Sequence, residues 1–195
     1  MTRRHIPALV LAVVVALTGC TSMSGTGDKG FVSGDGQLEV RDASEREAPI
    51  ELTGEGLDGE PLDLADFRGK PVVINVWGAW CTYCRDEAPD VVGAAEELGD
   101  EASFVGINLR DSSPETAQSY ERTFGVEFPS FYAPDGKAML AFPGTLTPST
   151  IPATVVLDAE GRVAASIIGR LPSQQTLVDV TRDIADETAQ GSANG

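Results

Sequence analysis

Short apolar runs alternate with segments of helical periodicity through the middle of the chain. Residues 71–77 include the run Val-Val-Ile-Asn-Val-Trp, which is nearly all apolar and rich in β-branched side chains and predicts a buried strand. Apolar residues at positions 91, 92, 95 and 98 then recur at helical spacing and predict a helix over 82–98. A strand therefore turns into a helix close to position 81.

Further strands and helices follow. Ser113-Pro114-Glu115 supplies a capping residue and a favourable first turn for a helix, and Ser173 caps the last one. The predicted strands are 71–77, 103–108, 130–132, 153–157 and 163–168, and the predicted helical segments are 63–67, 82–98, 114–124, 137–142 and 173–189. Strands separated by helices, closing with a hairpin and a helix, predict an α/β fold with a mixed central sheet and helices on both faces.

The start of the chain has the order of charges typical of an export signal. Basic residues at 3–5 precede an apolar stretch at 8–17, which is too short to span a bilayer as a helix. The stretch ends in Leu17-Thr18-Gly19-Cys20, which resembles a bacterial lipobox. We therefore expect cleavage before Cys20 and lipidation of that cysteine. An ordinary signal peptide with a chance cysteine is the alternative, and Sec and twin-arginine export both stay open.

A polar segment follows the signal. Residues 21–37 are rich in glycine, serine and threonine, so we predict a mostly flexible tether with an r.m.s. reach on the order of 25–30 Å. Strand-like runs at 37–41 and 50–52 indicate an N-terminal strand extension that pairs with the domain edge. The predicted organisation is a signal peptide at 1–19, lipidated Cys20 and tether at 20–49, a domain at 50–189 and a disordered tail at 190–195.

Charge and histidine content exclude several classes of function. The chain has 14 basic and 30 acidic residues; without residues 1–19, which hold two arginines, 12 and 30 are left, a formal charge of −18. Such a domain offers no basic groove to nucleic acid, and any membrane attachment would depend on the lipid. His5 leaves with the signal, and the mature chain then has no histidine for a general base or a metal site.

The segment Trp80-Cys81-Thr82-Tyr83-Cys84 carries the clearest chemical signal. Cys81 falls in the first turn of the helix predicted over 82–98, where unpaired N–H groups and the helix dipole favour a thiolate. Cys84 lies one turn further on the same face, within disulfide reach. We expect a switchable disulfide, because a purely structural one would close a loop too short to add much stability.

Three features together resemble the thioredoxin fold over about residues 50–189. They are a strand leading into Trp-Cys-x-x-Cys, Pro89 five residues after Cys84, and Thr150-Ile151-Pro152 before a strand. The resemblance implies a cis bond at Pro152, next to the cysteine pair. The 68 positions from Cys84 to Pro152 leave room for an extra strand and helix. The run Cys84-Arg85-Asp86-Glu87-Ala88-Pro89 resembles the TlpA/ResA type of anchored, extracytoplasmic thiol-disulfide oxidoreductase.

That resemblance implies the reduction of disulfides in exported proteins, such as apocytochrome c during cytochrome c maturation. Cys81 would attack the substrate disulfide and Cys84 would resolve the mixed disulfide. Glu87 would accept the proton from Cys84, the alternative being a solvated glutamate near a helix N-terminus. The residues expected to contact the substrate are Trp80, Ile151 and Pro152, with the Ile151 backbone pairing with an extended segment.

Two positions depart from thioredoxin. Asn75 stands where thioredoxin has a buried aspartate, and since an amide cannot take up a proton, that task passes to Glu87 or water. Tyr83 brings no positive charge to stabilise the Cys81 thiolate, although Arg85 can offset this. The direction of electron flow therefore stays open, and a disulfide-forming oxidase is the main alternative.

The expected setting is extracytoplasmic, anchored by lipid to the bacterial cell membrane. We expect a monomer with no cofactor beyond its redox-active disulfide and no metal, exported protein substrates, and a membrane electron donor of the CcdA/DsbD type. A peroxidase of the same broad fold would need a threonine three residues before Cys81, where this chain has Gly78. A non-enzymatic Cu(I)-binding module would normally add a histidine to the two cysteines.

Overall fold

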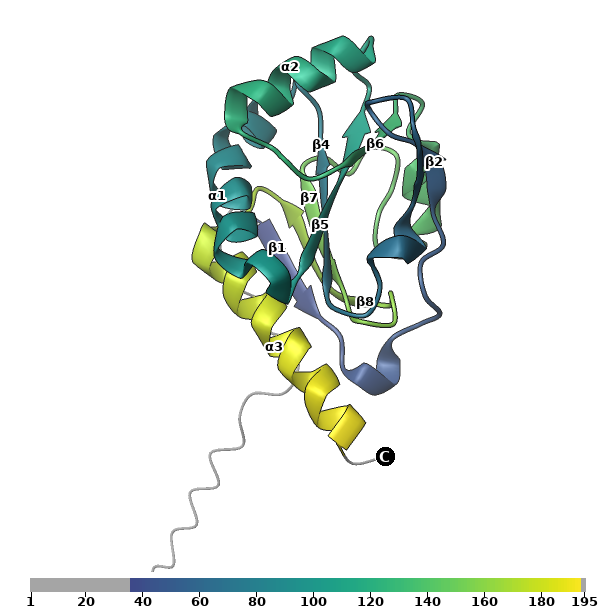
Figure 1. Cartoon of the computed structure of the whole chain (residues 1–195), viewed down its shortest axis with the longest axis vertical. Helices are drawn as coiled ribbons and strands as arrows, with labels where there is room; N and C mark the ends of the chain where they lie inside the picture. Colours follow the sequence, from purple (N-terminus) through teal and green to yellow (C-terminus); the bar gives the residue numbers. More distant parts are fainter. Residues whose placement is uncertain (1–35, 194–195) are drawn as a thin grey trace, which may run out of the picture.

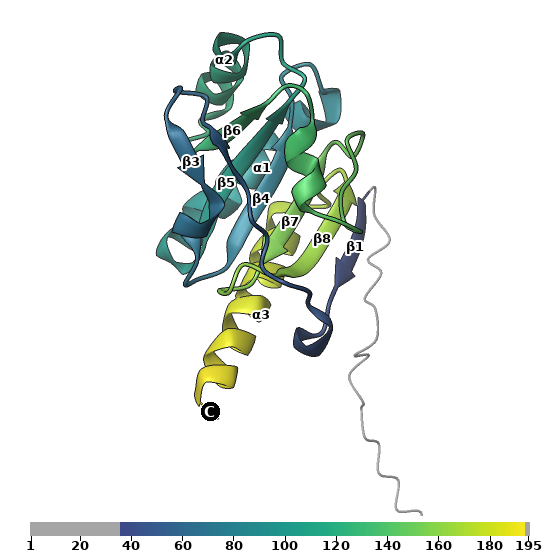
Figure 2. The same cartoon turned by 90° about the vertical axis from the view of Figure 1, so that its right-hand side faces the viewer.

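A six-stranded mixed sheet runs through the computed structural model, which describes residues 36–193 (Figures 1 and 2). The strand order is β1-β8-β7-β4-β5-β6; β4, β5 and β6 are parallel, and the other neighbours are antiparallel. Strands β2 and β3 form a separate hairpin. The strands are β1 (Gly36–Val40), β2 (Thr53–Glu55), β3 (Pro61–Asp63), β4 (Val72–Trp77), β5 (Ser103–Leu109), β6 (Ser130–Ala133), β7 (Ala153–Leu157) and β8 (Val163–Gly169).

Two of the three α-helices found within residues 36–193 have the bounds predicted from the sequence. The helices are α1 (Thr82–Leu98), α2 (Pro114–Phe124) and α3 (Gln174–Ala193), and the 3-10 turns are η1 (Ala43–Glu45), η2 (Leu64–Phe67), η3 (Gly99–Glu101) and η4 (Lys137–Ala141). In α2 both ends are set locally, because the Ser113 side chain accepts from the Thr116 N–H and Gly125 takes up a left-handed φ of 74°. The helical segment predicted at 137–142 is a 3-10 helix.

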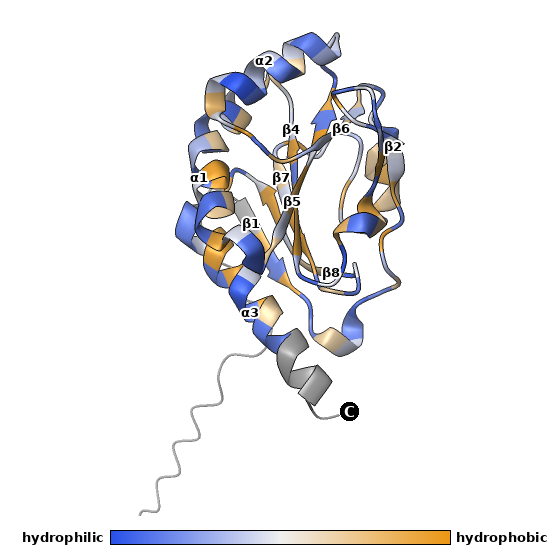
Figure 3. Cartoon of the chain, in the orientation of Figure 1, coloured by the Kyte–Doolittle hydropathy of each residue, from blue (hydrophilic) through white to orange (hydrophobic). Residues whose placement is uncertain are grey.

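Different elements cover the two faces of the sheet. Helices α1 and α3 lie side by side on one face, and α2 packs beside α1 (Figure 1). The opposite face is covered by η2 and η4, so its helical cover consists of 3-10 turns. Hydrophobic residues concentrate on the central strands, whereas α2 is largely hydrophilic (Figure 3). Helix α2 and strand β6 are the extra helix and strand expected between Cys84 and Pro152.

The domain begins before the predicted boundary at residue 50. Strand β1 pairs antiparallel with β8, with Leu38 opposite Ile167, which confirms the N-terminal strand extension and contradicts a flexible tether reaching residue 49. No strand forms at 50–52, since the Ile50 N–H donates to the Gly161 carbonyl (2.8 Å) outside any strand. The apolar side chains at positions 50 and 52 are instead buried against the face of the sheet that η2 and η4 cover. Both errors arise because the partners lie far away in the sequence.

Most of the predictions for the two ends of the chain concern residues outside the described range. The predicted signal peptide and Cys20, with the tether up to residue 35, lie outside the described residues, as do residues 194–195 of the predicted tail. Residues 190–193 continue α3 instead of forming a disordered tail. Most residues at 185–190 are good helix formers, so Gly191 does not end the helix where the sequence suggested.

A buried ion pair fastens the segment after β1 to the rest of the domain. Arg46 donates from Nη1 to the Asp158 carboxylate (3.3 Å), and the two side chains are 2% and 0% exposed. The same guanidinium pairs with Glu187 on α3. Asp158 also accepts from the Arg162 backbone N–H (2.9 Å), so its charge is held at the β7–β8 turn.

Replacing Arg46 by alanine should lower the free energy of unfolding by about 2 kcal/mol, because it removes a buried guanidinium that pairs with both Asp158 and Glu187, while Arg162 still pairs with Asp158 (2.8 Å). Chemical denaturation of the purified chain measures this change. Arg182→Ala is the matched control, since Arg182 makes ion pairs with Glu97 and Glu101 at the surface and should cost less than about 1 kcal/mol. Equal losses in the two variants would contradict a special role for Arg46.

Candidate active site

The two cysteines lie at the C-terminal end of β4, where the chain turns into α1. Cys81 is the N-cap residue of α1, and its Sγ accepts from the Cys84 N–H (3.2 Å). The two cysteines form a disulfide, with their Cα atoms 5.3 Å apart. Cys81 keeps 6% of its surface exposed and Cys84 only 1%. Cys81 is thus the cysteine that an incoming disulfide can reach first, and its position at the helix N-terminus favours its thiolate.

The loop before β7 comes to the same place. The Ile151–Pro152 bond is cis, as the resemblance implied, and Ile151 packs against the apolar cluster that contains both cysteines. Tyr83, between the cysteines, shares a pocket of about 380 Å³ with these two residues and with Gly169 and Arg170 at the end of β8. The structure therefore brings the predicted substrate residues Ile151 and Pro152 beside the cysteine pair.

Glu87 is buried one helical turn beyond Cys84, with 1% of its surface exposed. Its carboxylate accepts from the Leu171 N–H (2.8 Å) and from the Asn75 Nδ2 (3.3 Å). Burial raises the pKa of Glu87 to about 7, opposed by these two hydrogen bonds and by the positive charge of Arg170. This burial excludes the alternative in which Glu87 is a solvated side chain near the helix N-terminus. Asn75 is one of the two hydrogen-bond donors to the Glu87 carboxylate.

Tyr120 of α2 is a residue of the site that sequence reasoning missed. Its hydroxyl donates to the Cys84 carbonyl (2.8 Å), and its ring stacks on Trp77 with centroids 4.3 Å apart. Burial raises the pKa of Tyr120, so the hydroxyl stays a donor. Because 36 positions separate Tyr120 from Cys84, the only hint in the sequence is the helical spacing of the apolar positions 117, 120 and 124, which predicts that Tyr120 faces inward.

The loop carrying Trp80 is held by the end of β5, through a second set of residues that the sequence did not single out. The Trp80 indole N–H donates to the Leu109 carbonyl (3.0 Å), while half of the side chain stays exposed. The buried Asp111 carboxylate accepts from the Ala79 N–H (3.0 Å) and from the Asn108 Nδ2 (2.6 Å). Trp80 is therefore presented beside Cys81 in a fixed orientation.

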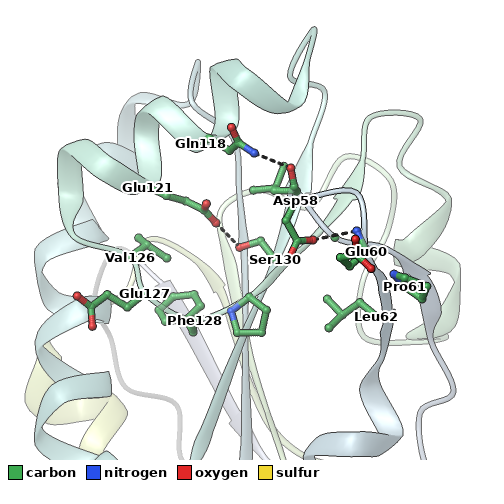
Figure 4. Close-up of a pocket in the computed structure, with 13 residues that line it drawn as sticks. Asp58, Glu60, Pro61, Leu62, Gln118, Glu121, Val126, Glu127, Phe128 and Ser130 are labelled. Carbon is green, nitrogen blue, oxygen red and sulfur yellow. Dashed lines mark hydrogen bonds between the residues drawn. The ribbon is translucent and has the colours of Figure 1, made fainter.

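A second pocket, of about 340 Å³, lies between the β2–β3 hairpin, α2 and β6 (Figure 4). It is acidic, since Asp58, Glu60, Glu121 and Glu127 line it, and it contains none of the predicted site residues. Burial raises the pKa of Glu121, whose carboxylate accepts from the Ser130 hydroxyl (2.9 Å).

Within residues 36–193, no group of three or more histidine, cysteine or acidic side chains could hold a metal ion. No helix in the same range is long and apolar enough to cross a membrane.

The relatives of this chain include thiol-disulfide oxidoreductases, in agreement with the cysteine site described above. The chain is 25% identical to the thiol-disulfide oxidoreductase ResA of Bacillus cereus over 171 residues, which cover 86% of this chain and 91% of that protein. This confirms the resemblance to ResA predicted from the sequence.

Solved structures confirm the thioredoxin-like fold. A DsbF homologue from Corynebacterium diphtheriae has 34% identity and a TM-score of 0.67, covering 80% of this chain and 98% of its own. A secreted thiol-disulfide isomerase from Corynebacterium glutamicum has 31% identity and a TM-score of 0.68, covering 82% and 98%. A sequence profile of the AhpC/TSA family matches residues 45–166, from the 3-10 turn after β1 into β8 and across the whole cysteine site. The chain therefore belongs to the AhpC/TSA family.

Proposed function

We propose that this thiol-disulfide oxidoreductase works as a reductase of disulfides in exported proteins, with apocytochrome c as the model substrate. The observation that carries the proposal is the buried Glu87, which lies one helical turn from Cys84 with a pKa of about 7. A carboxyl group poised near neutral pH can take the proton that Cys84 must lose before it attacks. Reduction of the substrate is complete only when the Cys84 thiolate resolves the mixed disulfide, so Cys84 has to lose this proton.

The proposed cycle starts from the reduced protein. The Cys81 thiolate attacks one sulfur of the substrate disulfide, which forms a mixed disulfide and releases the other sulfur as a thiolate. Cys84 then passes its thiol proton to Glu87 and attacks the Cys81 sulfur. The second substrate sulfur leaves as a thiolate, so the substrate has gained two electrons and the protein holds the Cys81–Cys84 disulfide. A membrane dithiol donor of the CcdA/DsbD type would return the pair to the reduced state.

The substrate chain would lie against the loop before β7. Ile151 and Pro152 line a pocket with Tyr83, and the Ile151 backbone would pair with an extended segment around the substrate disulfide. Trp80 would contact the same segment from the other side of Cys81, since half of its side chain is exposed. This mode gives affinity through the backbone with little sequence preference.

The proposed location is extracytoplasmic, with the domain held at the membrane by lipid on Cys20. Relatives with solved structures include a secreted thiol-disulfide isomerase, and the basic and apolar order of residues 3–17 supports export. We propose that the domain acts as a monomer, with its own disulfide as the only redox group.

The reduction potential of Cys81/Cys84 separates a reductase from an oxidase. Equilibration with glutathione, in a chain carrying Cys20→Ser, should give a value of about −270 mV or below, close to that of thioredoxin. Tyr83 between the cysteines brings no cation that would stabilise the thiolate and raise the potential. A value near about −120 mV would overturn the proposal and assign the protein to disulfide formation.

A further inference from the structure

A groove of about 780 Å³ runs between the loop carrying Trp80 and helix α2. It starts at Ala79 and Trp80, directly before Cys81, and reaches Thr123 near the end of α2. None of the reactions described above uses it. Its size and its position next to the disulfide make it a place where a substrate polypeptide can extend beyond the cysteine pair.

The strand order places this groove opposite the pocket at Pro152. The groove is lined by residues 110–112 after β5 and by α2, whereas the Pro152 pocket lies at the ends of β7 and β8. Strand β4, which leads to the cysteines, lies between β7 and β5 in the sheet. A segment that crosses Cys81 from the Pro152 pocket therefore arrives in the groove.

Two arginines line the groove in fixed positions. The Arg85 guanidinium lies over the Phe124 ring, 5.4 Å from its centroid. Arg110 donates from Nη2 to the Pro148 carbonyl (2.6 Å), and its φ of 60° makes it the one non-glycine residue with positive φ between residues 36 and 193. Such strain in a residue beside an active site often accompanies a functional position of its side chain.

Of the two acidic side chains that line the groove, one is buried and one is exposed. Asp111 is 4% exposed and accepts from the Ala79 N–H and from Asn108. Glu115 lies exposed in the first turn of α2, where a hydrogen bond with Ser113 lowers its pKa and keeps its carboxylate ionised. The groove thus offers a ligand two guanidinium groups against one exposed carboxylate, within a chain whose formal net charge is −16.

We propose that this groove binds the polypeptide flanking the substrate disulfide and selects an acidic side chain through Arg85 and Arg110. The inference rests on the proposed function, since it requires a disulfide-bonded polypeptide substrate. The net negative charge of the domain repels an acidic partner over most of its surface and favours the orientation in which its acidic segment meets the two arginines. Guanidinium–carboxylate pairs also add hydrogen bonds of fixed geometry.

The test compares two peptides joined to a short thiol by a disulfide, identical except for two glutamates or two lysines beside the cysteine. Single-turnover rate constants are measured for the reduced full chain carrying Cys20→Ser. We expect the acidic peptide to react at least about five times faster at low ionic strength, and the ratio to fall towards one in about 0.5 M salt. A ratio of one or less at low salt would overturn the inference.

The variant Arg110→Asn assigns the preference to the groove, because asparagine tolerates the left-handed backbone. The ratio between the two peptides should fall at least about two-fold in Arg110→Asn and should stay unchanged in Arg122→Gln, which removes one exposed charge from α2 outside the groove. An unchanged ratio in Arg110→Asn, or an equal fall in both variants, would overturn the assignment. Because the ratio is taken within each variant, a general change in reactivity cancels.

A small neutral disulfide separates this inference from the function on which it rests. If the reduced wild-type chain reacts with 2-hydroxyethyl disulfide but shows no preference between the peptides, the groove inference fails and the proposed function stands. If it reacts with none of the three disulfides, the proposed function fails, and the groove inference fails with it.

Discussion

Replacing Cys81 by serine should abolish disulfide reduction, with a loss of more than about a thousand-fold in rate. A serine hydroxyl in this position has no neighbouring general base and stays protonated, so the reaction loses its nucleophile. Cys81 is also the more exposed cysteine and the N-cap of α1, so Cys84, at 1% exposure, cannot take over the attack. The release of thiol from a disulfide-linked peptide measures the loss.

Cys84→Ser is the matched control, because it removes a sulfur from the same disulfide and leaves the attacking thiol. This variant should form the mixed disulfide and stop there, since no second thiol is available to resolve it. Mass spectrometry should therefore find one substrate peptide bound per chain in Cys84→Ser and none in Cys81→Ser. The reverse result would mean that Cys84 is the attacking cysteine and that the proposed order of steps is wrong.

Local signals explain why much of this site could be predicted. The bounds of α1 and α2 follow from apolar spacing and from capping residues such as Ser113, which act over a single turn. The cysteine pair and Pro152 belong to motifs a few residues long. The cis bond and the extra helix and strand between Cys84 and Pro152 came from the resemblance to a known fold, and the structure confirms them.

The parts that could not be predicted depend on contacts between distant residues. Arg46 meets Asp158 across 112 positions, and Tyr120 meets the Cys84 carbonyl across 36, so neither contact leaves a local pattern. The apolar alternation at 50–52 shows the opposite error, because burial alone produced a pattern that is typical of a strand. Glu87 lies between these cases, because its spacing from Cys84 pointed to it and only the fold shows its burial.

Replacing Glu87 by glutamine should slow the resolution of the mixed disulfide by about 100-fold at pH 7 to 8. The variant keeps an oxygen for the Leu171 N–H, and its amide can donate to Asn75 after that side chain turns, so the packing is preserved. It cannot take up a proton. The inflection near pH 7 that Glu87 gives to the rate of resolution should therefore be absent from the variant.

The same substitution should make the protein more stable above pH 7. In the folded state the pKa of Glu87 is about 7 because of burial, against 4.5 for the free side chain, so between these pH values the folded state binds more protons than the unfolded state. The free energy of unfolding then falls as the pH rises through this window, by about 3 kcal/mol in all. Glutamine removes this dependence, so the variant should exceed the wild type by about 2–3 kcal/mol at pH 8 and match it below pH 4.5.

Asp86→Asn is the control, since it removes a neighbouring charge that is exposed on the same helix. It should change the rate of resolution by less than about two-fold and the free energy of unfolding by less than about 0.5 kcal/mol. Urea denaturation across pH 4.5 to 8 and stopped-flow kinetics measure the two effects. A glutamine variant that gains stability at high pH and loses the resolution step shows that burial of this carboxylate is kept at a cost to the fold because the chemistry needs it. A variant that gains stability and keeps its full rate would mean that water takes the proton, and that Glu87 has no part in the reaction.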